Sequence, residues 1–199
     1  MPLPGALKRF SIIVPTPDGG SLENLEESLR TQLRDGDEVL VVGDTHESEL
    51  GQVREWVELQ PHWRWLEHDA GRHAWGHPQI NFGMQHAEGD YILFQDDDDV
   101  YYPDALLNIR RAVKHLDPPR PLLFRFRAQR AGGMVFWTNR GLVAQARIGG
   151  HCMVVPNCKE KLGSWTDRYE GDFDFIVETL RLWEPLEPVW RDEVIVLAR

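Results

Sequence analysis

The apolar run from Tyr91 to Phe94 leads, through Gln95, into four consecutive aspartates, Asp96 to Asp99. A short apolar run of this kind predicts a buried strand, so the carboxylates fall at the rim of a sheet. Carboxylates that lie close together repel one another and cost stability unless a positive charge neutralises them. A solvated acidic turn is the simpler interpretation. Four aspartates in a row at a strand end favour a site for a divalent cation with oxygen ligands, Mn²⁺ or Mg²⁺.

Strand and helix patterns alternate through the first half of the chain. Continuous apolar runs predict strands at residues 10–14, 39–42, 63–66 and 91–94, and apolar residues at helical spacing predict helices between them. Strands that are apolar throughout are typical of a mostly parallel sheet with helices on both faces. Ligands bind such sheets at the carboxyl ends of the strands, where Pro15, Thr16, Asp44 and the four aspartates all lie. We therefore expect an α/β fold with its site at that rim.

The second half of the sequence is less regular. Strands are predicted at residues 122–127, 134–137, 152–155 and 194–197, a helix at 172–183, and a hairpin turn at 132–133. No repeat, linker or low-complexity tract separates the two halves. We therefore predict a single domain over residues 1–199.

Composition excludes several classes of function. The chain of 199 residues carries a net charge of −10, which argues against a nucleic-acid partner bound through its phosphates. No apolar run approaches the length of a transmembrane segment, and the first residues lack the pattern of a signal peptide. The two cysteines, Cys152 and Cys158, do not have the spacing of a zinc site. We expect a cytoplasmic protein with reduced thiols; the sequence does not indicate its oligomeric state.

Charge is distributed unevenly along the chain. Between Arg72 and Arg110 every charged side chain is acidic, whereas between Asp117 and Glu160 every one is basic. This order of charge fits a site that holds a metal ion beside an anion. Two unrelated surfaces would also produce it.

Four blocks of sequence, in this order, resemble family 2 glycosyltransferases, which have the GT-A fold. The blocks are Ser11–Thr16, Asp37–Asp44, Asn81–Asp99 continuing into Tyr102–Leu106, and Leu162–Asp167 with Asp172–Phe175. The third block is the most specific, and the resemblance covers most of residues 8–183. It implies a nucleotide-sugar-binding half at residues 8–116 and an acceptor and catalytic-base half at residues 117–199.

The resemblance aligns the Asp-x-Asp metal motif of the family with Asp96 to Asp98. It implies that Asp98 is a direct ligand of Mn²⁺ or Mg²⁺, and that Asp96 contacts the ribose or reaches the metal through water. Because a strand alternates faces, Asp97 and Asp99 fit a plain surface role better, although Asp97 also matches the nucleotide side of the motif. Some GT-A enzymes use a late histidine as a metal ligand, and His151 is the candidate here. His73 and His77 are further histidines that could line the site.

Further matches concern the nucleotide. Pro15 and Thr16 match the loop beneath the base, and Asp44 matches the residue that accepts a hydrogen bond from the base or ribose. Arg72 matches a position near the diphosphate, where a guanidinium pairs with phosphate oxygens. Asn81 matches a loop-to-helix element beside the donor. Ordinary roles compete with each match: Asp44 and Asn81 suit turns or caps, and Arg72 suits an exposed loop.

The family places its catalytic base in a Glu-Asp pair, and here the pair reads Gly171-Asp172. The resemblance assigns the base to Asp172, with Glu170 as the fallback and Asp174 as a weaker one. A base of this kind takes the proton of the acceptor hydroxyl. Alternatively, Asp172 is a first-turn helix carboxylate, and that location would lower its pKa. Trp75 and Trp165 could stack on a sugar ring, although tryptophan is more often a core residue.

Taken together, the resemblance implies a metal-dependent enzyme that moves one sugar from a nucleotide-diphosphate sugar, with a UDP-sugar favoured, to an acceptor hydroxyl with inversion. The Gln-x-x-Arg-Trp motif of processive synthases is absent from the sequence, and Leu180–Trp183 lacks its glutamine. A non-catalytic nucleotide-sugar-binding module stays open because the glutamate of the base pair is missing. A sugar nucleotidyltransferase ranks lower, since residues 15–20 hold no lysine or arginine. A calcium loop ranks lowest, because residues 96–105 lack the glycine and final glutamate of an EF-hand.

Overall fold

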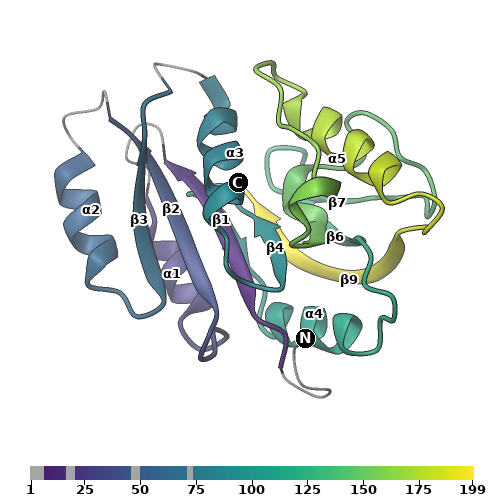
Figure 1. Cartoon of the computed structure of the whole chain (residues 1–199), viewed down its shortest axis with the longest axis horizontal. Helices are drawn as coiled ribbons and strands as arrows, with labels where there is room; N and C mark the ends of the chain where they lie inside the picture. The colour runs from purple at the N-terminus through teal and green to yellow at the C-terminus, as the bar shows by residue number, and fades with distance from the viewer. Residues whose placement is uncertain (1–6, 17–20, 46–49, 71–73) are drawn as a thin grey trace.

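The computed structural model describes residues 7–16, 21–45, 50–70 and 74–199, and its first half alternates strands with helices as predicted (Figure 1). The elements of this half are β1 (Phe10–Thr16), α1 (Glu23–Leu29), β2 (Glu38–Asp44), α2 (Leu50–Glu58), β3 (Trp63–His68), the 3₁₀ turn η1 (Ala74–Gly76), α3 (His77–His86), β4 (Tyr91–Phe94), β5 (Val100–Tyr101) and α4 (Ala105–Lys114). Three details differ from the prediction. The apolar spacing predicts a first helix that continues to Leu33, whereas α1 ends at Leu29. It predicts a third helix from Ile80, whereas α3 begins at His77, and it does not predict β5.

The second half contributes mostly strands that return to the same sheet. Its elements are β6 (Leu122–Ala128), β7 (Met134–Phe136), the 3₁₀ turn η2 (Gly150–Cys152), β8 (Met153–Pro156), the 3₁₀ turn η3 (Lys159–Lys161), α5 (Gly171–Leu182) and β9 (Val189–Ala198). The predicted hairpin is confirmed, because β6 and β7 pair in antiparallel fashion around the glycine turn.

In the described part of the chain, nine strands form one sheet in the order β3-β2-β1-β4-β8-β6-β9-β5, with β7 attached to β6. Parallel pairing joins β3, β2, β1 and β4, and also β6 and β9. The remaining pairs are antiparallel, because β8 runs against both β4 and β6, β7 runs against β6, and β5 runs against β9. The predicted α/β class is confirmed, and its parallel part carries the acidic turn at the end of β4.

Helix α3 packs closely on the sheet because a glycine faces the strands. Figure 1 shows α3 in front of β1 and β2, with α1 behind them. A Cβ atom on Gly83 would lie 2.7 Å from Cγ2 of Ile13 and 3.3 Å from Cγ2 of Val42. Both of these strand residues are fully buried. The absence of a side chain at residue 83 therefore sets the distance of α3 from the sheet.

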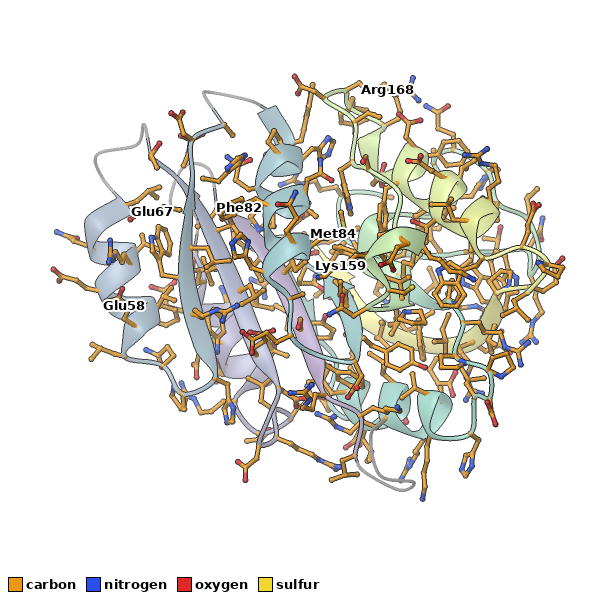
Figure 2. All side chains as sticks on the ribbon, in the orientation of Figure 1. Glu58, Glu67, Phe82, Met84, Lys159 and Arg168 are labelled. Atoms are coloured by element: carbon orange, nitrogen blue, oxygen red, sulfur yellow. The ribbon has the colours of Figure 1, made fainter. Side chains whose placement is uncertain are left out.

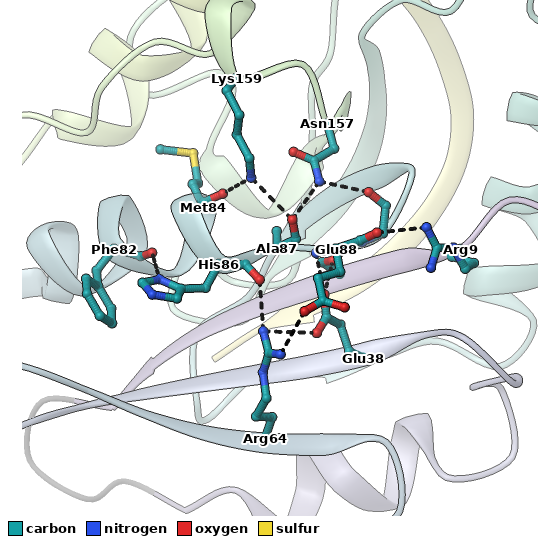
Figure 3. Close-up of polar contacts among 12 residues, drawn as sticks. Arg9, Glu38, Arg64, Phe82, Met84, His86, Ala87, Glu88, Asn157 and Lys159 are labelled. Carbon is teal, nitrogen blue, oxygen red and sulfur yellow. Dashed lines mark hydrogen bonds and ion pairs between the residues drawn. The ribbon is translucent and has the colours of Figure 1, made fainter. Parts of the chain in front are cut away.

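Two cations hold the C-terminal end of α3 (Figure 3). Lys159 donates from Nζ to the carbonyl oxygen of Met84 and, at 3.3 Å, to that of Ala87. Arg64 of β3 donates from Nη2 to the carbonyl oxygen of His86 at 2.8 Å. The last carbonyls of a helix have no partner inside it, and positive charge is favourable there. Figure 2 shows Lys159 beside Met84 near the centre of the molecule, so this anchor fixes α3 and leaves its N-terminal end to the site.

Candidate functional site

A pocket of about 650 Å³ opens where β1 and β4 end. Its walls come from both halves of the chain, namely Pro15, the start of α3, the acidic turn, Arg130 beside the β6–β7 hairpin, residues 145–151 and the first turn of α5. The carboxyl edge of the parallel strands is thus the edge that carries the cavity, as predicted.

The four aspartates lie in a turn that follows β4. The backbone N–H of Asp99 donates to the carbonyl oxygen of Asp96 at 3.3 Å, which bends the chain back. Asp99 is only 1% exposed, and it accepts hydrogen bonds from Nε2 of Gln95 at 2.6 Å and from the backbone of Arg199 at 2.9 Å. The surface role expected for Asp99 was wrong, because its side chain is buried; strand alternation does not extend to it, since β4 ends at Phe94.

The turn and η2 bring three metal-ligating groups together. One ligand atom from each of Asp96, Asp99 and His151 lies within 4.8 Å of the other two. The His151 ring is half-buried, and its Nε2 atom has no hydrogen-bond partner in the described part of the chain. Imidazole nitrogen and carboxylate oxygen are ligand types that Mn²⁺ accepts, and Nδ1 of His151 lies 3.9 Å from Oδ2 of Asp99. The residues present therefore fit a divalent cation.

The pKa shifts of Asp96, Asp99 and His151 also favour a bound cation. Burial, followed by the nearby charge of Asp96, raises the pKa of Asp99 to about 8. The pKa of Asp96, which is exposed at the pocket, is also raised, first by desolvation and then by the charge of Asp98. Burial lowers the pKa of His151 to about 4, so its imidazole is neutral. Crowded carboxylates and a neutral imidazole are the conditions under which a cation stabilises a site.

Asp98 and Asp97 have other partners. The Asp98 carboxylate lies 3.5 Å from Nη2 of Arg130, whose side chain is 83% exposed. Asp97 accepts a hydrogen bond from the buried Oγ1 of Thr16 at 2.9 Å. Both aspartates still line the pocket, but they lie outside the group of three ligand atoms found among the described residues.

The residues matched to the nucleotide are spread along the same edge. Pro15 lines the pocket, while Asp44 is 4% exposed and accepts a hydrogen bond from Nε2 of Gln79 at 3.2 Å. Asn81 exchanges two hydrogen bonds with the backbone of Trp165, at 2.8 and 3.0 Å, and so ties α3 to the segment before α5. Arg72 and His73 lie outside the described residues.

Asp172 is the second residue of α5, and its side chain faces the pocket. Its Oδ1 atom accepts the backbone N–H of Phe173 at 2.7 Å. The first-turn position is confirmed, but the expected lowering of the pKa was wrong. Burial raises the pKa of Asp172 and outweighs the backbone hydrogen bond and the neighbouring His151.

The two alternative candidates for the catalytic base, Glu170 and Asp174, both accept hydrogen bonds from neighbouring side chains. Glu170 stands at the rim of the pocket and accepts a hydrogen bond from Nε2 of Gln145 at 3.0 Å. Asp174 accepts two hydrogen bonds from Arg168, both at 2.6 Å, and its pKa is lowered by them. Arg168 appears on the outer edge of the molecule in Figure 2.

The sequence-based predictions gave too little weight to Asp99 and Arg130. Asp99 was discounted, and Arg130 was one of several basic residues between Asp117 and Glu160; the uneven charge was the signal that could have singled it out. His77 does line the pocket, and its Nδ1 atom lies 2.7 Å from the carbonyl oxygen of Thr166. Of the two tryptophans, Trp165 is 7% exposed and belongs to the core, whereas Trp75 is 50% exposed at the pocket.

Comparison with known proteins decides the family. A sequence model described as Glycosyl transferase family 2 matches residues 11–140, more than half of the chain. The chain belongs to glycosyl transferase family 2. A search among curated proteins found no match for this family 2 domain. Among the described residues, no helix of the domain is both long enough and apolar enough to cross a membrane.

Solved structures share the fold of the domain. The crystal structure of S. aureus TarS gives a TM-score of 0.77 at 17% identity over 96% of this chain, and TarS 1–349 in complex with UDP-GlcNAc gives 0.75 at 18% over the same share. The mannosyltransferase PcManGT from Pyrobaculum calidifontis, in complex with GDP-Man and Mn²⁺, gives 0.66 at 19% over 99%. The domain spans 36%, 58% and 58% of those three chains, respectively. It therefore has the GT-A fold of glycosyltransferases.

Proposed function

We propose that this family 2 domain transfers one sugar from a nucleotide-diphosphate sugar to an acceptor hydroxyl, with inversion and with Mn²⁺ or Mg²⁺ as cofactor. The observation that carries the proposal is the convergence of Asp96, Asp99 and His151, of which Asp96 and His151 line the pocket together with Asp172. Residues 8–116 would supply most of the donor side, and residues 117–199 the acceptor side and the base.

Asp96, Asp99 and His151 would hold the cation. When bound, a divalent ion would supply positive charge for the departing diphosphate. Asp98 was the direct ligand implied by the family motif, and we place it on the diphosphate side of the same turn. Arg130 pairs with Asp98 and is largely exposed, so its guanidinium is free to turn towards phosphate oxygens.

Nucleotide recognition would fall to the first half of the domain. We assign Pro15, Thr16 and Asp97 to the base and ribose side, with Asp44 accepting a hydrogen bond from a uracil N–H or a ribose hydroxyl. Arg72 and Asn81 are assigned to the neighbourhood of the diphosphate, Asn81 by positioning α3. A UDP-sugar is the favoured donor. The solved structures similar to this domain include complexes with UDP-GlcNAc and with GDP-Man, so both bases belong in the test.

Asp172 would accept the proton of the acceptor hydroxyl. A raised pKa makes a carboxylate a stronger base near neutral pH, and burial provides it here. Glu170 at the rim would be the fallback. Transfer of a single sugar, not polymer synthesis, follows from the missing Gln-x-x-Arg-Trp motif.

Two measurements test this proposal. Thermal unfolding with UDP, GDP and dTDP should show stabilisation that requires Mn²⁺; a ligand at one hundred times its Kd adds about 2.7 kcal/mol. Release of UDP or GDP from UDP-GlcNAc, UDP-glucose or GDP-mannose should then disappear in Asp172→Asn while the Mn²⁺-dependent stabilisation remains. Asp174→Asn is the matched control, because it makes the same change in the same helical turn outside the pocket lining.

The outcomes separate the alternatives. Stabilisation without turnover in the unaltered protein would identify a non-catalytic binding module. Absence of any Mn²⁺-dependent stabilisation would contradict the donor site itself.

A further inference from the structure

Two aromatic side chains stand exposed at the mouth of the pocket. Trp75 is 50% exposed and Tyr169 is 73% exposed, and both belong to the pocket lining. Their rings meet edge to face, with centroids 5.9 Å apart and planes at 74°. The pair joins the two halves of the domain, because Trp75 precedes α3 and Tyr169 precedes α5. Exposing aromatic rings to water costs free energy. A pair of exposed rings at the mouth of a pocket therefore indicates a ligand-binding surface.

The backbone holds Trp75 in this position. Trp75 has a φ of +71°, a left-handed conformation that side chains other than glycine rarely adopt. Gly76 also has a positive φ, and a Cβ atom there would lie 2.6 Å from Cβ of Pro15. The Trp75 ring also lies beside the His77 ring, with centroids 6.1 Å apart. Strain of this kind persists where the surrounding structure requires it, commonly at ligand sites.

Planar polar groups border the pair. Glu170 follows Tyr169 directly and receives a hydrogen bond from Gln145 at the same rim. Asp172 lies further along the same segment and also lines the pocket. An alkyl chain would gain nothing from the carboxylates and the amide, and burying it against them would cost free energy. A pyranose ring fits both features, since its C–H face packs on an aromatic ring and its hydroxyl groups pair with carboxylates and amides.

We propose that the Trp75–Tyr169 pair is the stacking platform for a sugar ring of the acceptor, so that the acceptor class is a saccharide. This inference rests on the proposed glycosyl transfer, because it supplies the acceptor hydroxyl for Asp172. The pair acts by binding and orienting the acceptor, so it influences the KM for the acceptor more than the chemical step.

The experiment compares acceptors in the presence of Mn²⁺ and a saturating sugar nucleotide. Methyl glucoside, methyl mannoside, methyl N-acetylglucosaminide and cellobiose are tested beside n-octanol and a serine-containing peptide, with nucleoside diphosphate release as the readout. At least one saccharide should accelerate release. Trp75→Ala and Tyr169→Ala should each lower kcat/KM for that saccharide by roughly tenfold, mainly through KM.

Controls separate this inference from the proposed function. Trp75→Phe keeps an aromatic face and should retain most of the acceptor affinity. Val177→Ala removes an exposed apolar side chain from α5 outside the pocket lining and should change nothing. Mn²⁺-dependent stabilisation by UDP or GDP should persist in both alanine variants, which distinguishes loss of acceptor binding from loss of the donor site.

Three results would overturn the inference: no saccharide in the panel accelerates release, only n-octanol or the peptide does so, or the alanine variants keep the full acceptor kcat/KM. If the unaltered protein shows neither nucleotide stabilisation nor donor hydrolysis, the proposed function has failed first.

Discussion

Nδ1 of His151 lies 3.9 Å from Oδ2 of Asp99, although the two residues belong to different halves of the chain. The contact places a neutral imidazole from η2 against the turn that follows β4. Because Asp96 lies in the same group, three ligand atoms of types that Mn²⁺ accepts face one another across the sheet rim.

Removing the Asp99 carboxylate should therefore weaken the binding of Mn²⁺ and leave the fold intact. Asp99→Asn preserves the size of the side chain and can still accept the backbone N–H of Arg199. We expect it to weaken Mn²⁺ affinity by at least about tenfold, as loss of a ligand should cost no less than loss of an outer-shell partner. Titration calorimetry with Mn²⁺ and UDP measures this, and far-UV circular dichroism confirms folding. Asp98→Asn is the control, and an equal or larger loss there would favour Asp98 as the ligand.

Substitution of Gly83 should show how tightly α3 packs on the sheet. Alanine inside a helix is normally more favourable than glycine by about 1 kcal/mol. At residue 83 the added methyl group meets Ile13 and Val42, so Gly83→Ala should destabilise the domain by about 1–3 kcal/mol. Gly51 in α2 has no atom within 4 Å of the same position, and Gly51→Ala should be neutral or stabilising. Urea denaturation of both variants gives the comparison, and equal effects would contradict the close packing of α3.

Much of the fold was predictable from local sequence. The buried strands of the first half are continuous apolar runs, and such runs specify strands with little help from the rest of the chain. The start of α3 carried a readable signal as well, since Pro78 occupies its first turn, where proline is favoured. The start was missed because glycine and histidine around it resembled a loop.

The site was harder to predict because its geometry depends on contacts distant in sequence. Asp99 becomes a candidate ligand only because the chain turns after Phe94 and because β9 returns to place Arg199 beside it. His151 joins it through η2, and nothing in the local sequence around either residue encodes that approach. Likewise, the exposure of Trp75 and the burial of Trp165 depend on how the segments before α3 and α5 pack together.

The two cysteines should react very differently with a thiol reagent. Cys152 is fully buried, and desolvation raises its pKa to about 12, whereas Cys158 is partly exposed with a smaller upward shift. Because the thiolate is the reactive form, native protein at pH 8 should incorporate one equivalent of iodoacetamide, at Cys158. Peptide mass spectrometry locates the label. Unfolding in urea should expose the second thiol, and fast labelling of Cys152 in the native state would contradict its burial.

Stability should depend on pH through Asp174. Hydrogen bonds from Arg168 and Thr166 lower the pKa of this carboxyl in the folded state. A lowered pKa means that the contribution is present above the unfolded value near 3.9 and is lost as the pH falls through the folded value. Asp174→Asn should therefore reduce the urea midpoint slightly at pH 7 and pH 5, and the difference should shrink below about pH 4. In an Arg168→Met background most of this difference should vanish; its persistence there would contradict the ion pair as the cause.

The most direct test is the position of the metal. Crystals grown with Mn²⁺ and UDP, measured at the manganese absorption edge, give an anomalous difference map that locates the ion without assumptions. We expect one strong peak in contact with carboxylate oxygens of Asp96 and Asp99 and with the ring of His151. A peak bound by Asp98 away from His151, or no peak within the pocket, would contradict it.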